Sequence, residues 1–166
     1  DLGNYEVANF IFPQPGTNIS EHFKLRRGNV DSAWARCAAV VDGTFRLPQI
    51  QHVPIEPHVA VGLWETSEQV TLWTCSQSPF AQRDMIAQSL DIPHGNLRVV
   101  SPYVGGGFGG KAGISMEACA VVMAQAVKGH PVKLRMTREE EFVGTNVRQS
   151  LVARTKIGCD ATGNLL

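Results

Sequence analysis

The chain has 166 residues, a length that suits one domain with a sizeable buried core. Its 15 Lys and Arg residues balance its 15 Asp and Glu residues without a basic stripe, and no segment resembles a signal peptide or a membrane span, which argues against nucleic-acid-binding and membrane-spanning classes. The four cysteines lie about forty residues apart with no CxxC pair, which argues against a zinc ribbon or redox dithiol and predicts reduced core thiols in a cytoplasmic protein.

The first part of the chain, residues 1–38, is predicted to be a leading segment or linker. It holds the stretches IFPQPGTN and KLRRGN and a short helix at 30–38. Residues 39–166 are expected to form part of an α+β domain. Its first strands are predicted at 39–47, 50–64 and 69–77. The polar tetrad ETSE is typical of a hairpin turn between the last two strands.

A helix is predicted to begin at Pro79, after the N-cap Ser78, and to end near Leu90. Its apolar stripe, at a period of 3.6 residues, consists of Phe80, Ile86, Ala87 and Leu90. The strand-like run NLRVVSP follows and leads directly into a glycine-rich loop.

The chain after the loop alternates helices and strands. A second helix is predicted at 115–128, with Ser115 as its cap and Gly129 as its left-handed C-terminal stop. After a strand at 131–136, the tetrad TREE forms a capping box that opens a short third helix, and 148–160 alternates like a long strand. We therefore predict an α+β fold, a mixed sheet with two main helices and a short third helix packed on it. The sequence ends two residues into an expected return strand, which suggests a piece of a longer polypeptide.

The loop VGGGFGGK fits two nucleotide-binding patterns at once. GxxxxGK runs from Gly105 to Lys111, and GxGxxG takes Gly105, Gly107 and Gly110. Glycines let the backbone approach a ligand, and their N–H groups can surround an oxyanion near a helix N-terminus. The loop therefore favours an anion or a polarised oxygen near 107–110. The alternative is a turn that only lets two elements pack closely.

Neither nucleotide-binding pattern is complete. A P-loop needs Ser or Thr after its lysine to bind Mg²⁺, and here that residue is Ala112. A dinucleotide-binding loop needs an acidic residue about twenty positions further on, and residues 125–135 contain none. A nucleotide-binding enzyme that uses the GxxxxGK loop is therefore the weaker alternative.

A larger set of segments resembles the molybdenum hydroxylases, the family of xanthine dehydrogenases and aldehyde oxidases, in their molybdopterin-binding subunit or domain. The segments follow the family's order and spacing: HFKLRRGNVDSAWARC, TCSQSPFAQR, VGGGFGGK, KGHPVKLRMTREEEF and LVARTKIGCDATGNLL. This ordered set is more specific than the glycine loop alone. After the loop lysine, the pattern looks most similar to bacterial nicotinate-dehydrogenase-type and xanthine-dehydrogenase-type subunits.

The resemblance implies molybdenum held by molybdopterin, which in this family is often extended as a cytosine dinucleotide. The glutamine of the family's SQ motif, here Gln77, approaches the apical oxo group of the metal, where a carboxamide can donate without adding charge. The loop phenylalanine, here Phe108, lines the metal and pterin pocket with its backbone. Both are expected near the metal without being direct ligands. The implied cofactor-binding residues are Gln77, Gly106, Gly107, Phe108, Gly109 and Gly110.

The implied reaction is the oxidative hydroxylation of an aldehyde or an N-heterocycle such as a purine or nicotinate. Electrons leave through iron–sulfur clusters and FAD on partner domains or subunits, and the remainder of the molybdenum subunit is a further partner. Purine-oxidising members carry a glutamate directly after the loop lysine, so Ala112 weakens xanthine as the substrate. No stretch matches the family's general base, so no catalytic residue is assigned and the isolated chain is expected to be inactive. The rival interpretation is a non-enzymatic α+β interaction module.

The remaining polar residues are expected to be structural. His52, Glu56 and His58 have the even spacing of one strand face, which could hold a metal, but prolines between them break the pattern. We therefore expect hydrogen-bonded surface or interface residues. The acidic run 139–141 is expected to be a solvated helix start, and Lys111 a structural or surface charge.

Overall fold

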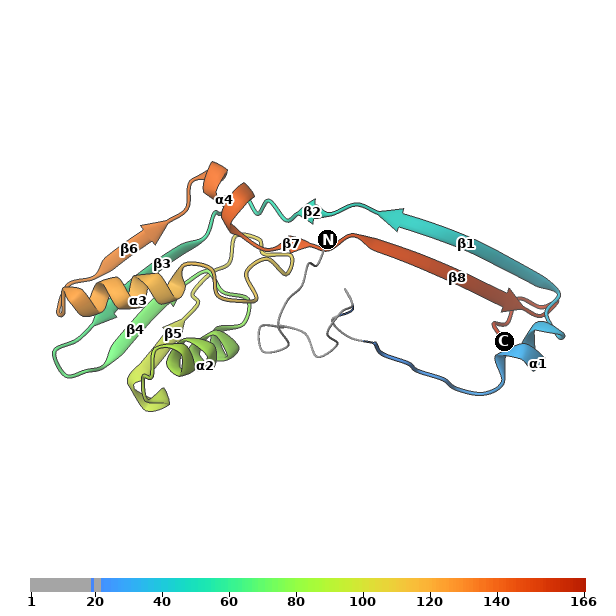
Figure 1. Ribbon diagram of the computed structural model, residues 1–166, viewed down its shortest axis with the longest axis horizontal. Helices are drawn as coiled ribbons and strands as arrows, with labels where there is room; N and C mark the ends of the chain where they lie inside the picture. The colour runs from blue at the N-terminus through green and yellow to red at the C-terminus, as the bar shows by residue number, and fades with distance from the viewer. Residues whose placement is uncertain (1–18, 20–21) are drawn as a thin grey trace, which may run out of the picture. The chain divides into compact units, whose positions relative to one another are not determined.

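The computed structural model describes residue 19 and residues 22–166, so most of the predicted leading segment before residue 22 lies outside the described residues (Figure 1). The chain divides into two compact units, one formed by residues 1–43 and 154–166 and the other by residues 44–153. The division predicted from the sequence, after residue 38, falls at a different place and stays a prediction.

The larger unit is built on a four-stranded mixed sheet in the order β5-β4-β3-β6 (Figure 1). β3 (Val59–Trp64) and β4 (Val70–Thr74) form the antiparallel hairpin predicted around ETSE. β6 (Val132–Arg135) pairs antiparallel with β3, and β5 (Leu97–Val100) runs parallel to β4. The sheet is therefore mixed, as the sequence predicted.

The connections of the sheet carry the helices. Between β4 and β5 lie α2 (Pro79–Ser89) and the short 3-10 helix η2 (His94–Asn96). Between β5 and β6 lie the glycine loop and α3 (Glu117–Ala126). α4 (Arg138–Gly144) opens with the predicted capping box, and β2 (Ile50–Gln51) pairs antiparallel with β7 (Val147–Arg148).

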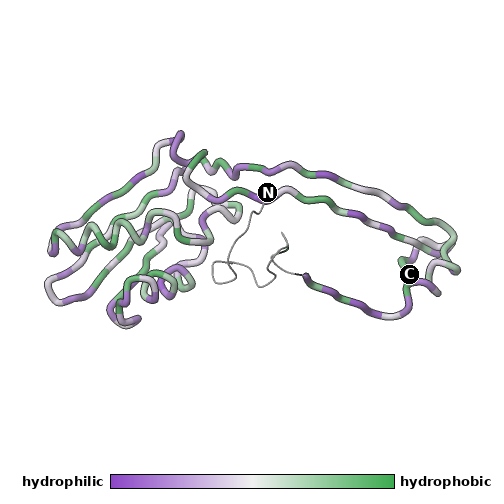
Figure 2. Tube along the Cα trace, in the orientation of Figure 1, coloured by the Kyte–Doolittle hydropathy of each residue, from purple (hydrophilic) through white to green (hydrophobic). Residues whose placement is uncertain are grey.

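The core of the larger unit lies between the sheet and the helices α3 and α2, the latter contributing Ile86 and Ala87. Residues of β3 alternate between buried and half-buried, and hydrophobic segments run along β3, β4 and α3 (Figure 2). Leu72 of β4 and Val121 of α3 are fully buried, and each such side chain contributes about 2 kcal/mol. Gly62 lets α3 approach closely, because a Cβ there would lie 2.6 Å from the carbonyl oxygen of Ala120.

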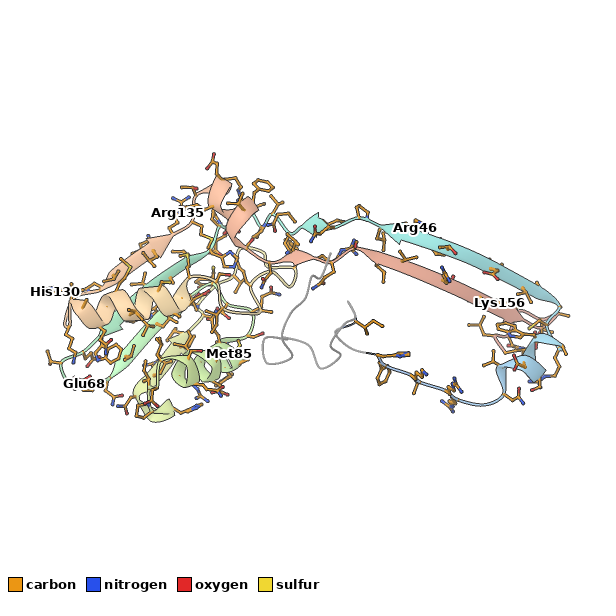
Figure 3. All side chains as sticks on the ribbon, viewed as in Figure 1. Arg46, Glu68, Met85, His130, Arg135 and Lys156 are labelled. Carbon is orange, nitrogen blue, oxygen red and sulfur yellow. The ribbon has the colours of Figure 1, made fainter. Side chains whose placement is uncertain are left out.

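The smaller unit holds α1 (Val30–Trp34), whose N-cap Asn29 accepts a hydrogen bond from the Ser32 N–H at 3.0 Å. β1 (Ala39–Leu47) and β8 (Leu151–Cys159) form a separate two-stranded sheet. Lys156, labelled in Figure 3, places its Nζ 4.8 Å from the centroid of the Trp34 ring. An ammonium over an aromatic face is weakly attracted to it, which helps to order this unit.

Several local predictions were wrong. The strand predicted at 50–64 is interrupted, because residues 52–58 form no strand and Val53 has a φ of 46°. Phe80 is 74% exposed and does not belong to a buried stripe of α2, whereas Gln82 is buried and donates to the Gly113 carbonyl at 2.9 Å. Ser78 is the N-cap of α2, although its side chain makes no capping bond.

The start of α3 also differs from the prediction. Ser115 does not cap the helix, which begins at Glu117 with Met116 as N-cap. Instead, the Glu117 carboxylate accepts the N–H groups of Ser115 and Met116 at 2.7 and 3.1 Å. A carboxylate accepts hydrogen bonds more strongly than a hydroxyl. All four cysteines are free, as predicted, but only Cys75 is buried in the core.

Candidate functional site

Gln77 lies in the turn between β4 and α2, directly beside the glycine loop. Its backbone N–H donates to the Lys111 carbonyl at 3.0 Å. Its side-chain Oε1 accepts the N–H groups of Gly109 at 3.0 Å and of Lys111 at 3.2 Å. The structure thus places the Gln77 carboxamide against the loop that carries Phe108, as the resemblance implied.

These two hydrogen bonds fix the orientation of the carboxamide. Because both donors point at Oε1, the amide nitrogen Nε2 lies on the other side, and it has no hydrogen-bond partner among the described residues. The Gln77 side chain is exposed, so this donor is accessible. A neutral –NH₂ group is therefore available to an acceptor atom beside the loop.

The loop backbone is left-handed at several positions. Gly106, Phe108 and Gly109 have φ values of 92°, 54° and 95°. A phenylalanine in this region is strained by roughly 1–2 kcal/mol. Gly107 is buried, and a Cβ there would lie only 2.3 Å from the Oε1 of Gln77. Glycine at this position therefore makes room for the carboxamide.

The predicted cradle of loop N–H groups is narrower than the sequence suggested. The N–H groups of Gly109 and Lys111 are engaged by Gln77, and that of Gly110 donates to the Gly107 carbonyl at 2.8 Å. In the part of the chain that the structure describes, the loop N–H groups without such partners are those of 106–108. The N-terminus of α3 is occupied by the carboxylate of Glu117. Little of the loop is left to surround a phosphate.

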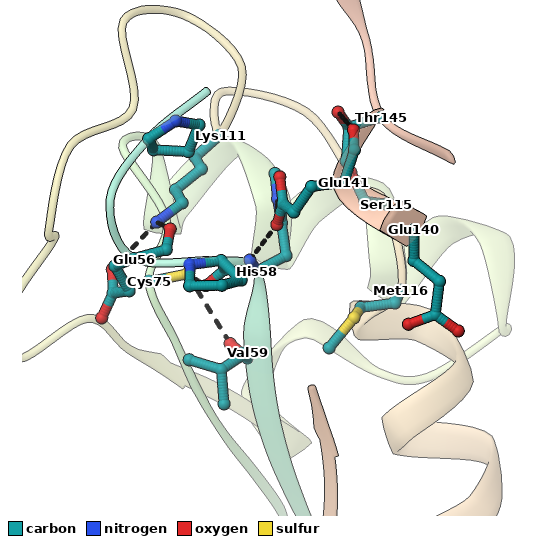
Figure 4. A network of polar contacts seen from close by, with 12 residues as sticks. Glu56, His58, Val59, Cys75, Lys111, Ser115, Met116, Glu140, Glu141 and Thr145 are labelled. Atoms are coloured by element: carbon teal, nitrogen blue, oxygen red, sulfur yellow. Dashed lines mark hydrogen bonds and ion pairs between the residues drawn. The ribbon is translucent and has the colours of Figure 1, made fainter. Parts of the chain in front are cut away.

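Lys111 does not reach out to a nucleotide either. Its side chain is buried, and Nζ donates to the carbonyl oxygen and to Oε2 of Glu56 at 2.8 and 2.9 Å (Figure 4). Burial alone would raise the pKa of Glu56, but the Lys111 ammonium and the Gly105 N–H outweigh it and hold the pKa below its ordinary value. Lys111 is thus a buried structural charge, not a surface charge, and the P-loop alternative is wrong.

An open pocket lies beside the loop. It has a volume of about 770 Å³. Phe108 lines it with a side chain that is 72% exposed, so the ring does not fill the core. One cation, Arg148, lines the pocket, and no carboxylate does. The full lining consists of Gln49, His52, Phe108, Gly109, Thr145, Asn146, Val147, Arg148 and Gln149.

One wall of this pocket is held by residues whose role the sequence did not reveal. The His52 ring makes a hydrogen bond through Nδ1 to the Asn146 carbonyl at 3.1 Å. The Gln51 amide donates to the Glu141 carbonyl at 2.9 Å and to the Thr145 hydroxyl at 3.1 Å. Gln51 and Glu141 are 90 positions apart, and the other two pairs are each 94 positions apart. No local sequence pattern signals such pairing.

The predicted surface roles of His58 and Glu141 were wrong. Both side chains are buried, and the His58 Nδ1 lies 2.8 Å from the Glu141 Oε1 (Figure 4). Glu139 and Glu140 are exposed, as expected of a solvated helix start. In the described residues no group of three His, Cys, Asp or Glu side chains could hold a metal ion. Burial raises the pKa of the Cys75 thiol, so this neutral group is a poor metal ligand or nucleophile.

Comparison with known proteins identifies the family. The family model described as "Molybdopterin cofactor-binding domain" matches residues 11–166. The chain belongs to the molybdopterin cofactor-binding domain family. The match spans both compact units, so it covers the glycine loop, Gln77 and the pocket beside Phe108.

Relatives of this molybdopterin cofactor-binding domain are parts of molybdenum oxidoreductases. The aldehyde oxidoreductase molybdenum-binding subunit of Escherichia coli is 33% identical over 138 residues, which cover 83% of this chain and 19% of that subunit. The nicotinate dehydrogenase large molybdopterin subunit of Eubacterium barkeri is 31% identical over 150 residues, which cover 90% of this chain and 35% of that subunit.

A solved structure supports the same fold. Quinoline 2-oxidoreductase of Pseudomonas putida 86 superposes with a TM-score of 0.67 at 32% identity, over 84% of this chain and 18% of that chain. The molybdopterin cofactor-binding domain thus spans about a fifth of the length of the first curated relatives it matches. Among the residues described, no helix is both long and apolar enough to cross a bilayer.

The geometry of the loop fits a cofactor that needs hydrogen bonds and close backbone approach. Gln77 presents a neutral donor, and the backbone at 106–108 has no side chain except that of Phe108. Any side chain in place of Gly107 would displace the Gln77 carboxamide. These features suit an uncharged, tightly shaped contact to a pterin-bound metal centre.

Proposed function

We propose that this domain binds a molybdenum–molybdopterin cofactor against the glycine loop and Gln77, as one part of a larger oxidoreductase. Gln77 and Phe108 lie nearest the metal in this proposal, and neither is a direct ligand. The proposed cofactor-binding residues are Gln77, Gly106, Gly107, Phe108, Gly109 and Gly110. The observation that carries the proposal is the fixed carboxamide of Gln77, whose Oε1 accepts two loop N–H groups and whose Nε2 is uncommitted.

The residues of this chain bind and orient rather than react. Gln77 donates from Nε2 to an acceptor of the cofactor and adds no charge to the site. The exposed ring of Phe108 lines the pocket, and in this proposal it packs against the bound cofactor. When bound, the cofactor supplies the two-electron oxidation of a carbon centre. No residue of this chain is proposed as catalytic.

The substrate class follows from the named relatives. They include an aldehyde oxidoreductase, a nicotinate dehydrogenase and a quinoline oxidoreductase. We infer the oxidative hydroxylation of an aldehyde or an N-heterocycle for the complete protein. Ala112 supplies no carboxylate next to the loop, so a purine is the less favoured substrate.

Further parts of the enzyme are proposed on the same resemblance. The cofactor is proposed to carry a cytosine dinucleotide, and the partners are the remainder of the molybdenum subunit together with iron–sulfur and FAD domains or subunits. The site is proposed to operate in the cytoplasm. The isolated 166-residue chain is proposed to be inactive, because it spans about a fifth of its relatives.

The test measures molybdenum in the complete protein that contains these 166 residues. The protein is produced in cells supplied with molybdate, and its metal content is measured by plasma mass spectrometry. We expect stoichiometric molybdenum in the unmodified protein and a large loss in Gln77→Glu, because a carboxylate removes the donor and adds negative charge. Turnover of an aldehyde, nicotinate and quinoline with an artificial electron acceptor then separates the substrate classes.

A matched control is the same chemical change at an exposed residue. Gln125 of α3 is exposed, so Gln125→Glu is expected to retain molybdenum and activity. Absence of molybdenum from the unmodified protein would reject the proposed function and favour the alternative of a non-enzymatic interaction module. A Gln77→Glu variant with unchanged molybdenum and turnover would show that the carboxamide does not serve the cofactor.

A further inference from the structure

Lys111, the last residue of the glycine loop, is the only lysine or arginine buried in the described part of the chain, with 2% of its surface exposed. A buried ammonium is costly unless it is paired and hydrogen-bonded. Its Nζ donates twice to Glu56, to the carbonyl and to the carboxylate, at 2.8 and 2.9 Å, and it also interacts with the Cys75 thiol (Figure 4). The end of the loop is therefore fastened to Glu56.

The beginning of the loop is fastened to the same residue. The Gly105 N–H donates to the Oε2 of Glu56 at 2.8 Å, and the Glu56 N–H donates to the Gly105 carbonyl at 3.1 Å. The two backbones approach so closely that a Cβ on Gly105 would lie 2.5 Å from the Glu56 Cβ. One carboxylate oxygen thus joins the two ends of the loop, since Oε2 accepts from both Gly105 and Lys111.

The loop between these ends has a conformation that needs support. Phe108 is one of four non-glycine residues with positive φ in the described chain, and it lies between two left-handed glycines. Strained backbone persists only where the surrounding structure fixes it. The N–H groups of Gly109 and Lys111 are held by Gln77. Glu56 gives further support at the two loop ends.

We propose that the Lys111–Glu56 pair is a clamp that positions the glycine loop, and that Lys111 is therefore a positioning residue of the cofactor site. The effect of the clamp on the loop conformation is independent of any ligand, whereas its effect on cofactor retention rests on the proposed function. A buried ion pair is weak support for stability, because an apolar pair of similar volume often replaces it without loss. An apolar pair cannot accept a hydrogen bond from the Gly105 N–H, however. Replacing the ion pair by apolar residues can therefore restore the stability of the core without restoring the position of the loop.

The first measurement is hydrogen–deuterium exchange by mass spectrometry on the complete protein from cells that cannot make the pterin. Lys111→Met removes the ammonium and leaves the volume nearly unchanged. We expect roughly tenfold faster exchange in a peptide covering 103–111, because the two Nζ hydrogen bonds are lost and the Glu56 carboxylate that accepts the Gly105 N–H is no longer held in place. Peptides from β3 and β4 should exchange at the unmodified rate. Lys133→Met, at an exposed lysine of β6, should change neither region.

A double variant distinguishes positioning from core filling. Lys111→Met with Glu56→Leu removes both charges, so the buried-charge penalty disappears and the melting temperature is expected to return close to that of the unmodified protein. Fast exchange of the 103–111 peptide is expected in the double variant as well, because Glu56→Leu leaves the Gly105 N–H without its acceptor. A double variant with normal loop protection would overturn the proposal. Glu56→Gln keeps the shape of the side chain and an acceptor oxygen, and we expect it to retain loop protection better than the double variant.

Molybdenum retention then separates the clamp from the proposed function. Stoichiometric molybdenum in the unmodified protein and in Lys133→Met, with loss in Lys111→Met and in the double variant, supports both. Faster loop exchange without molybdenum in any form supports the clamp and rejects the cofactor. Unchanged loop exchange in Lys111→Met rejects the clamp, whatever the metal content of the unmodified protein.

Discussion

Replacement of Gly107 by alanine tests whether the Gln77 carboxamide packs against the glycine loop as described. The backbone at Gly107 does not require a positive φ, so alanine is conformationally allowed there. The new Cβ, however, would lie 2.3 Å from Oε1 and 2.4 Å from Cδ of Gln77, well inside contact distance. Because the side chain is more mobile than the backbone, we expect the carboxamide to leave its place.

The size of the effect follows from the bonds that are lost. Gln77 would release the N–H groups of Gly109 and Lys111, and each hydrogen bond contributes about 1 kcal/mol. Alanine returns roughly 0.4–1 kcal/mol by restricting the unfolded chain. The net cost is therefore about 1–1.5 kcal/mol, which corresponds to roughly a tenfold larger population of the open loop.

The assay is hydrogen–deuterium exchange of the peptide that spans residues 105–112 in the complete protein, together with its molybdenum content. We expect about tenfold faster exchange in Gly107→Ala and a loss of molybdenum. The control is Gly95→Ala, because a Cβ at Gly95 meets nothing within 4 Å. Normal exchange and full molybdenum in Gly107→Ala would show that Gln77 is not seated as described.

Three further outcomes are expected. Gly62→Ala should lower stability by about 1–3 kcal/mol, because the new Cβ would lie 2.6 Å from the carbonyl oxygen of Ala120. Thermal unfolding followed by near-ultraviolet circular dichroism measures this loss. An unchanged melting curve would contradict the close packing of α3 on β3. His58→Ala should cost about 1–3 kcal/mol in the same experiment, because the buried Glu141 carboxylate loses the imidazole and keeps only the backbone N–H of residue 58. A loss below about 0.5 kcal/mol, the size expected of a surface substitution, would exclude this role. The pKa of Glu56 is lowered in the folded protein, so the stability that its carboxylate contributes is complete above the ordinary value of 4.5 and is lost as pH falls through the lowered value. The difference in melting temperature between the unmodified protein and Glu56→Gln should therefore shrink in that acidic range. A difference that grows in acid would contradict the lowered pKa.

The sequence alone was sufficient where the signal is local. The capping box of Thr137 and Glu140 and the hairpin around ETSE depend on residues a few positions apart, and both are present. The resemblance implied that Gln77 and the loop face one cofactor, and the structure does bring the Gln77 carboxamide against the loop, whereas its role toward a cofactor stays a prediction. The mixed sheet followed from the same alternation of hairpins and strand–helix–strand units.

The sequence was insufficient where burial depends on distant partners. Lys111 and Glu56 are 55 positions apart, and His58 and Glu141 are 83 apart, so nothing in either neighbourhood reveals the pairing. Charged residues are expected at the surface unless a partner compensates their desolvation, and that partner becomes visible only after folding. At the start of α3 the sequence favoured Ser115 as the cap and Glu117 only as a charge near the positive end, because Ser is the commoner N-cap residue.

The attachment of Gly105 and Lys111 to one glutamate also limits how this loop can evolve. With both ends held at a fixed separation, an insertion or deletion between them would break the clamp, whereas a substitution just beyond it would not. Ala112 stands at that neighbouring position and is exposed. New side chains can therefore be tried at position 112 while the loop backbone keeps its shape.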